Sequence, residues 1–257
     1  MNKFSSAFLS ACALLWVSCQ PGQPKEESVK NQPAEINYYT PDSVQIFGDL
    51  YLKDKSAETI VLFHQARANA RGEYGPIIPE LTAMGYNVLA IDQRSGGQLF
   101  GSYNRTVAQI PLNRFSYCDA YPEMEEALNY LNTHGFKEGK IVWGSSYSAA
   151  LVIKLAAQHS DEVAGVLAFS PASGEPMEGC RPEEYFSTLK VPLLVLRPDS
   201  EMQYEFVKTQ FDSVAHTGHQ TYVAIGGKHG SSMLVSSRTN TNTEKTWEVV
   251  KVFLNSL

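Results

Sequence analysis

Short apolar runs alternate with stretches in which apolar residues recur every three or four positions, and this alternation constrains the fold most. The run TIVLFH (59–64) has no polar face, which is typical of a strand buried on both faces of a parallel sheet. The same criteria predict strands at 35–40, 44–52, 59–64, 87–92, 140–145, 163–170, 191–196 and 221–225. They predict helices near 77–84, 124–131, 147–158, 204–214 and 247–254. The sequence therefore predicts an α/β fold with a mostly parallel central sheet and helices on both faces.

Sheets of this kind bind ligands beyond the carboxyl ends of their strands, so the residues that follow each strand matter most. The segment GSSYS (144–148) joins a predicted strand to a predicted helix and matches G-x-S-x-G with Ser in its last position. The pattern holds a nucleophilic serine on a strained turn and needs small residues two positions before and after it. Ser145 would put Trp143 in one of those positions, and Ser148 would lie inside the helix. Ser146 is therefore the predicted nucleophile.

With this motif, residues 36–257 resemble the α/β-hydrolase family, in particular its small dienelactone-hydrolase-like members without a large cap domain. The chain order of nucleophile, acid and histidine also matches. His229, in AIGGKHGSS directly after the last predicted strand, stands where the family carries its general base. The resemblance implies a Ser-His-acid triad and no cofactor. Many dienelactone-type enzymes use Cys as nucleophile and this chain has Ser, so no dienelactone substrate is assigned.

The resemblance also implies two backbone donors for an oxyanion. The strand at 59–64 leads into His64 and Gln65, where family members often have His-Gly. The family pattern puts the Gln65 and Tyr147 N–H groups side by side, and such donors are worth ~3 kcal/mol each in acyl-transfer sites. Because Gln65 replaces the usual Gly, a donor at Ala66 stays open. His64 itself is expected to be structural.

Two carboxylates compete for the role of the triad acid in VPLLVLRPDSEM. In the family this strand leads into His-Gly-x-x-Asp, a register that places Glu201 on the acid and Asp199 two residues earlier. Pro198 fixes its own φ and biases Arg197 toward extended geometry, which favours one more residue of strand before the turn. That extension favours Glu201 as the acid, with Asp199 as the alternative.

Composition and charge exclude several classes of function. The net charge of −6 leaves no basic face for nucleic-acid phosphates. His216 and His219 form an H-x-x-H pattern without further zinc ligands, so no metal site is predicted. Arg94 follows the strand at 87–92 and allows two interpretations: it orients an acidic group of a substrate, or it braces the turn after the strand.

The N-terminal segment predicts export. Residues 1–18 are apolar and small after an early lysine, and they are too short for a membrane span, so they resemble a secretory signal peptide. Cys19 then resembles the lipidated cysteine of a bacterial lipoprotein, although Cys12 matches the wording of that motif better. The predicted organisation is a signal peptide, a lipidated Cys with a flexible tether over 19–35, and a hydrolase domain over 36–257. The expected location is the periplasm or cell surface, with the lipid as the only membrane contact, and a plain secreted protein is the alternative.

Cys118 and Cys180 are the remaining cysteines of the predicted mature domain. Each lies in a long loop after a strand on the expected active-site side, and an exported protein meets oxidising conditions. A disulfide between them and two free buried thiols both remain open.

The predicted function is hydrolysis of a small-molecule carboxylic ester. Ser146 attacks the carbonyl while His229 removes its proton, and an acyl-enzyme forms and is then hydrolysed. A serine peptidase or amidase on the same fold is the alternative among enzymes. A binding lipoprotein that has lost activity is the alternative among non-enzymes, and the presence of both Ser146 and His229 argues against it.

Overall fold

The computed structural model describes residue 1 and residues 32–110, 115–136 and 139–257. Its contacts divide the chain into Met1–Gln32 and Pro33–Leu257, and the fold belongs to the second unit. The predicted signal peptide, Cys19 and most of the predicted tether lie outside the described residues. In the part of the chain that is described, no helix is both long and apolar enough to cross a membrane.

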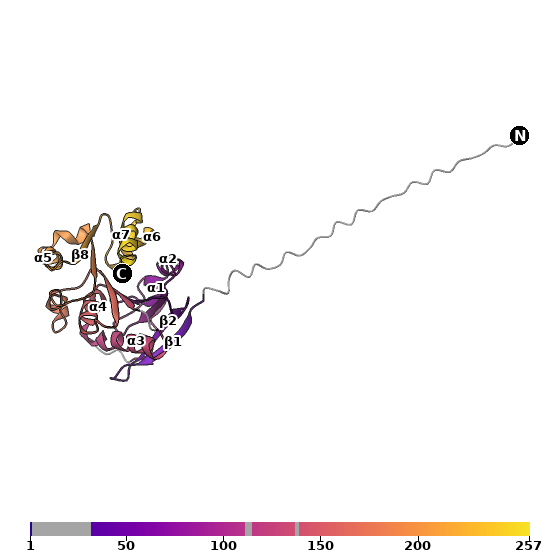
Figure 1. The fold of residues 1–257 in the computed structure, drawn as a ribbon, viewed down its shortest axis with the longest axis horizontal. Helices are drawn as coiled ribbons and strands as arrows, with labels where there is room; N and C mark the ends of the chain where they lie inside the picture. Colours follow the sequence, from indigo (N-terminus) through magenta and orange to yellow (C-terminus); the bar gives the residue numbers. More distant parts are fainter. Residues whose placement is uncertain (2–31, 111–114, 137–138) are drawn as a thin grey trace. The chain divides into compact units, whose positions relative to one another are not determined.

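A sheet forms the centre of the second unit (Figure 1). It has eight strands in the order β1-β2-β4-β3-β5-β6-β7-β8. β2 pairs antiparallel with both β1 and β4, and every other neighbouring pair is parallel. The strands are β1 (Ala34–Tyr39), β2 (Gln45–Tyr51), β3 (Thr59–Phe63), β4 (Asn87–Asp92), β5 (Lys140–Ser145), β6 (Val163–Phe169), β7 (Leu193–Pro198) and β8 (Gln220–Ala224).

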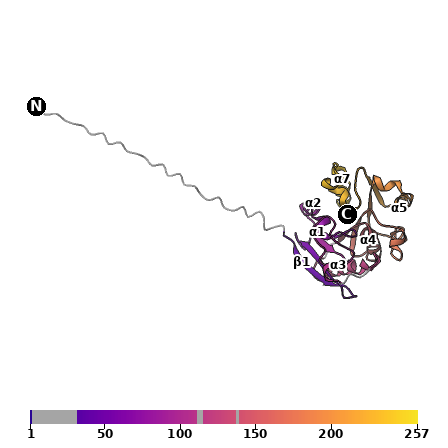
Figure 2. The same ribbon diagram turned by 180° about the vertical axis from the view of Figure 1, so that it is seen from behind.

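Helices cover both faces of this sheet, as the two opposite views show (Figures 1 and 2). Side chains alternate between the faces along a strand, so Val61 and Phe63 of β3 enter one core while Ile60 and Leu62 enter the other. The first core contains α3 (Tyr121–Thr133), α4 (Tyr147–Gln158) and part of α5 (Glu205–His216). The second contains α1 (Ala70–Tyr74), α2 (Ile78–Ala83) and α7 (Glu244–Leu254), and a one-turn helix α6 (Ser236–Thr239) lies between β8 and α7 in the chain.

The predicted α/β fold is confirmed, and each predicted strand is present at or next to its predicted place. The largest difference concerns β7, which begins at Leu193 instead of Val191 and continues through Arg197 and Pro198. Pro192 has no N–H for the ladder, which explains the later start. α1 was not predicted, because five residues are too few to show a helical period.

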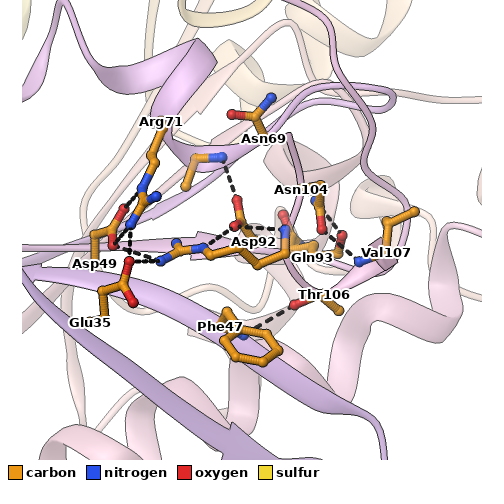
Figure 3. A network of polar contacts seen from close by, with 12 residues as sticks. Glu35, Phe47, Asp49, Asn69, Arg71, Asp92, Gln93, Asn104, Thr106 and Val107 are labelled. Atoms are coloured by element: carbon orange, nitrogen blue, oxygen red, sulfur yellow. Dashed lines mark hydrogen bonds and ion pairs between the residues drawn. The ribbon is translucent and has the colours of Figure 1, made fainter. Parts of the chain in front are cut away.

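A buried ion network ties α1 and the segment after β4 to the antiparallel edge of the sheet (Figure 3). The Arg105 guanidinium donates to Asp92 and to Asp49, each at 2.7 Å, and Arg71 Nε donates to Asp49 at 2.7 Å. Both aspartates are buried, and Asp92 Oδ1 also accepts the Ala70 N–H at 2.8 Å. The network therefore fixes the beginning of α1 relative to two strands.

Replacing Arg105 with methionine should lower the free energy of unfolding by about 3 kcal/mol, because the buried carboxylate of Asp92 loses its guanidinium partner and Asp49 keeps only Arg71. Lys251→Met is the matched control, since it removes an ion pair with Glu80 in which both side chains are largely exposed. The control substitution should lower the free energy of unfolding by at most about 1 kcal/mol. Urea titration measures both, and equal losses would show that the buried network contributes no more than a surface pair.

Candidate active site

Ser146 lies on a sharp turn between β5 and α4, at the carboxyl end of a central strand. Its φ is 60° and its ψ is −121°, a conformation that residues with a side chain rarely adopt. A Cβ on Gly144 would lie 2.4 Å from the carbonyl oxygen of Ser148, so only glycine fits two positions before the nucleophile. The backbone thus has the strained turn that the G-x-S-x-G pattern predicts at Ser146.

Ser148 stands where the pattern has its second glycine, and its hydroxyl has a structural role. Its oxygen lies 2.7 Å from the His64 carbonyl oxygen and 2.9 Å from Gln93 Oε1, and the hydroxyl can donate to either of these acceptors. These contacts connect the first turn of α4 with the ends of β3 and β4. The serine at this position therefore adds a connection between the loop that follows β3 and the turn at residues 144–148, called the elbow below.

His229 and Glu201 meet beyond the carboxyl ends of β7 and β8. His229 Nδ1 lies 2.5 Å from Glu201 Oε1, and the other carboxylate oxygen accepts from Arg197 Nη1 at 2.7 Å. Burial raises the pKa of Glu201, but the histidine and the guanidinium outweigh it, so the pKa lies below its usual value. Glu201 is therefore ionised at neutral pH and can orient the imidazole through Nδ1.

Asp199, the alternative acid, points elsewhere. Its carboxylate accepts the Gly226 N–H at 3.0 Å and has neither a hydrogen bond nor an ion pair with His229. Because β7 continues through Pro198, the turn that follows carries Glu201 to the histidine. The structure brings together the acid and base that the sequence favoured.

No hydrogen bond joins Ser146 Oγ to the His229 ring in the described part of the chain. The two loops are nevertheless packed together, because the Ser231 N–H donates to Ser145 Oγ at 3.0 Å and the two hydroxyls lie 2.6 Å apart. Hydrogen bonds between nucleophile and base are often long without substrate and shorten when it binds. The side chain of His229 is 53% exposed, which leaves its ring open to solvent and to substrate.

The predicted oxyanion donors differ in their availability. Tyr147 is the first residue of α4, where backbone N–H groups have no partner within the helix. The Gln65 N–H, in contrast, donates to Glu73 Oε2 at 2.7 Å, so this predicted donor already has an acceptor in the structure. The N–H of Ala66, the alternative, has no acceptor among the described residues. The two available donors are therefore those of Tyr147 and Ala66.

Three functional neighbours escaped the sequence analysis: Glu73, Tyr74 and Ser231. All three are buried, and Tyr74 Oη lies 3.3 Å from Ser145 Oγ while it donates to the Phe63 carbonyl oxygen at 2.7 Å. In the sequence, Glu73 and Tyr74 stand in a polar segment without a motif, so nothing distinguishes them from ordinary loop residues. Ser231 offered a weak signal, since it follows the predicted base by two residues.

No protein-family model matches the sequence, and no curated protein matches it. Solved structures match over most of the chain. The esterase Pf2001 of Pyrococcus furiosus superposes with a TM-score of 0.66 at 17% identity, covering 91% of this chain and 94% of that chain. Est1E of Butyrivibrio proteoclasticus with bound ferulic acid gives a TM-score of 0.63 at 13% identity, covering 84% and 96%. A dienelactone hydrolase from Anabaena variabilis gives 0.62 at 14% identity, covering 85% and 96%.

The chain has the α/β-hydrolase fold. Its β5–α4 turn carries Ser146, and its last two strands lead to Glu201 and His229. The strand order places β5 between β3 and β6, so the elbow has the loops after β3 and β6 as its neighbours. The Ala172 N–H, after β6, donates to the Ser146 carbonyl oxygen at 3.0 Å.

Two other residues singled out in the sequence are structural within this α/β-hydrolase fold. Arg94 is buried and pairs with Glu123 at 2.5 Å and with Asp42 at 2.5 Å, so it braces the turn and is not available to an acidic substrate. His64 is buried, and its Nε2 accepts the Gln93 N–H at 2.8 Å. Burial lowers the pKa of His64, so the ring stays neutral at physiological pH.

The H-x-x-H pattern does not form a metal site. His216 Nδ1 lies 2.6 Å from the Asp212 carbonyl oxygen, whereas His219 Nε2 lies 2.9 Å from that of Phe186. No group of three or more potential metal ligands occurs in the described residues. Both rings are used in separate backbone contacts.

Cys118 and Cys180 form a disulfide with an S–S distance of 2.02 Å. It connects the segment before α3 with the loop after β6. Tyr117, next to the bridge, stacks on Tyr147 with ring centroids 4.8 Å apart. The disulfide therefore holds an aromatic side chain against the residue that follows the candidate nucleophile.

A cavity of about 650 Å³ lies between α5 and the loop after β6. Its lining includes Ser173, Glu183, Phe206 and Gln210. The Gln210 side chain lies 3.4 Å from the carbonyl oxygen of Ala172, the residue whose N–H binds the Ser146 carbonyl. Ala172 therefore contacts both a residue of the cavity lining and the backbone of Ser146.

Glu201→Gln should leave the fold intact and lower kcat by about four orders of magnitude. Arg197 donates to one oxygen of Glu201 and would hold the amide oxygen of the glutamine, so the amide NH2 group would face His229 Nδ1 and favour the wrong tautomer. Asp199→Asn is the matched control, since its carboxylate meets only the Gly226 backbone, and it should keep most of the activity. One ester assay compares both variants with the wild type. Collapse of the Asp199 variant alone would contradict the assignment of the acid.

Proposed function

We propose that this protein is a serine hydrolase that cleaves carboxylic esters of small molecules through an acyl-enzyme. The observation that carries the proposal is the combination of a strained Ser146 and a carboxylate–histidine pair at the same edge of the sheet. A serine on such a turn exposes its hydroxyl above the sheet, which a merely structural serine does not need. A histidine held by an ionised glutamate is the general base that this nucleophile requires.

The proposed reaction begins when Ser146 Oγ attacks the ester carbonyl carbon and its proton moves to His229 Nε2. Glu201, at Nδ1, stabilises the imidazolium that forms. The carbonyl oxygen becomes an oxyanion and accepts hydrogen bonds from the N–H groups of Tyr147 and Ala66. The bond between the carbonyl carbon and the alkoxy oxygen then breaks while His229 donates its proton to that oxygen. The alcohol leaves, and an acyl group stays on Ser146.

Hydrolysis of the acyl-enzyme uses the same groups. His229 removes a proton from a water molecule, whose oxygen attacks the acyl carbon, and the second tetrahedral oxyanion meets the same two donors. Collapse of this intermediate releases the carboxylic acid and returns the proton to Ser146. The role of Arg197 is to hold the far oxygen of Glu201, which keeps the carboxylate aimed at Nδ1.

An ester is preferred to an amide because of the similar solved structures, of which Pf2001 is described as an esterase. These structures share the fold of this chain and support a hydrolase on it. A serine peptidase or amidase remains the alternative, and a binding lipoprotein without activity is the other. Assays on p-nitrophenyl esters and p-nitroanilides with the same acyl group separate the three.

A fluorophosphonate should label the wild-type protein, with the added mass on the peptide that contains Ser146. Ser146→Ala should lose the label and at least about a thousandfold in ester hydrolysis, because the nucleophile is gone. Ser56→Ala, an exposed serine on a turn, is the matched control and should label fully. Equal labelling of the Ser146 variant would rule out this nucleophile.

We further propose that the protein is exported and anchored by a lipid on Cys19. When the full chain is produced in a bacterium, the wild type should enter the detergent phase of Triton X-114, since acyl chains supply the membrane affinity. Cys19→Ser should move to the aqueous phase, whereas Cys12→Ser should behave as the wild type. A Cys19 variant that stays in the detergent phase would contradict the anchor.

A further inference from the structure

Glu73 is a buried carboxyl group next to the candidate active site that the proposed reaction leaves without a role. Its side chain lies in α1 and is fully buried. Oε2 accepts the Gln65 N–H at 2.7 Å, and Oε1 has no hydrogen-bond partner in the described part of the chain. Burying a carboxyl group with so few partners costs stability. Stability alone therefore does not explain why a carboxyl group is buried at this position.

The backbone that carries Glu73 is held rigidly. Asn69 Oδ1 caps α1 by accepting the Gly72 N–H at 2.7 Å, and the ion network of Figure 3 fixes Ala70 and Arg71. From α6, Arg238 donates to the carbonyl oxygens of Gly72 at 2.6 Å and of Glu73 at 3.0 Å. The carboxyl group of Glu73 is thus presented to Gln65 from a fixed support.

The contact between Glu73 and Gln65 lies where three loops of the site meet. Gln65 belongs to the loop at 64–69, called here the oxyanion loop. Its Oε1 lies 2.9 Å from the position a Cβ would take on Gly230, directly after His229. That same Cβ position is 3.2 Å from Ser145 Cβ, directly before the nucleophile. The hydrogen bond to Glu73 fixes the peptide group between His64 and Gln65. It therefore affects how the oxyanion loop packs against the elbow and against the loop after β8 that carries His229, the histidine loop.

We propose that Glu73 is a positioning residue of this active site, which accepts the Gln65 N–H and so directs the N–H of Ala66 toward the oxyanion. The inference rests on the hydrolase reaction proposed above. Turning the Gln65 N–H toward Glu73 leaves the following N–H as the donor for the substrate. In this proposal the oxyanion donor of the loop is the Ala66 N–H, the alternative that the sequence left open, instead of the Gln65 N–H.

The charge of Glu73 adds a pH dependence. The charged and titratable groups that face it are Arg238, His229, Tyr74 and Tyr147, and the Ser145 hydroxyl is also close. Burial raises the pKa of Glu73 to about 7, in spite of the Gln65 N–H and Ser145. Glu73 therefore ionises near neutral pH. The ionised carboxylate holds the Gln65 N–H by a charge-assisted hydrogen bond, which is about twice as strong as a neutral one.

Two variants separate the accepting oxygen from the charge. Glu73→Gln keeps an oxygen that can accept the Gln65 N–H and cannot ionise, whereas Glu73→Ala removes both. We expect Glu73→Ala to lower kcat by about tenfold or more at every pH, with little change in KM, because only the transition state needs the aligned donor. Glu73→Gln should match the wild type at pH 5.5 and fall progressively behind above pH 7. Dividing the wild-type rate by that of the Gln variant removes ionisations common to both.

Two measurements without substrate accompany the assay. Hydrogen exchange of the amides at 65–69 should be at least about tenfold faster in Glu73→Ala than in the wild type, because the loop loses its fixed acceptor. A raised pKa also means that neutral Glu73 favours the fold, so this contribution is present at low pH and lost as the pH rises through 7. The wild type should therefore lose stability between pH 5.5 and 8.5 relative to Glu73→Gln, seen as a lower urea midpoint.

The outcomes distinguish this proposal from the proposed function. If the wild type neither hydrolyses esters nor reacts with a fluorophosphonate, the hydrolase proposal fails, while hydrogen exchange and stability still report on Glu73. If the wild type is active and Glu73→Ala keeps its kcat and its slow exchange at 65–69, the positioning role is wrong. If the rate ratio of wild type to Glu73→Gln is the same at every pH, the charge of Glu73 has no part in positioning the loop, and the proposed pH dependence is wrong.

Discussion

The strained backbone at Ser146 is the constraint on which the rest of the site depends. A residue with a side chain at a φ of 60° costs energy, and the surrounding structure must hold it there. Gly144 allows α4 to approach β5 closely, and the Phe169 carbonyl oxygen accepts the Ser146 N–H at 2.9 Å. The parallel sheet supplies the fixed framework for this turn, because β5 has a strand on each side.

Ser145 connects this turn to the other loops of the site. Its hydroxyl lies within hydrogen-bond distance of Ser231 and Tyr74, and Trp143 Nε1 donates to the Ser231 hydroxyl at 2.8 Å. The elbow, the histidine loop and α1 therefore share one buried polar cluster. Such clusters specify a single arrangement when each member is satisfied. Next to this cluster, Glu73 Oε1 and Gln65 Oε1 are buried without a hydrogen-bond partner among the described residues. Of these two groups only Glu73 can ionise, so its charge can affect the fit of the loops.

Sequence reasoning reached the fold and the principal side chains because both depend on local patterns. Strand runs and helical stripes predicted the sheet, and the effect of Pro198 on its neighbour predicted that β7 continues until Glu201 can reach His229. The sequence did not predict that the Gln65 N–H in the oxyanion loop is bound to Glu73. The geometry of this loop depends on Glu73, which comes eight residues later in a helix too short to show a period, and no local pattern reveals such a tertiary contact. Arg94 was left between two roles for the same reason, since its partners lie on distant segments.

The most direct test of this account is a crystal structure of the protein after reaction with a fluorophosphonate, because the phosphonyl oxygen occupies the place of the oxyanion. The account predicts phosphorus bonded to Ser146 Oγ, with that oxygen accepting the N–H groups of Tyr147 and Ala66. It also predicts that the Gln65 N–H stays on Glu73 and that His229 keeps its contact with Glu201. Phosphorus on another residue, or a phosphonyl oxygen bound by the Gln65 N–H, would contradict the account.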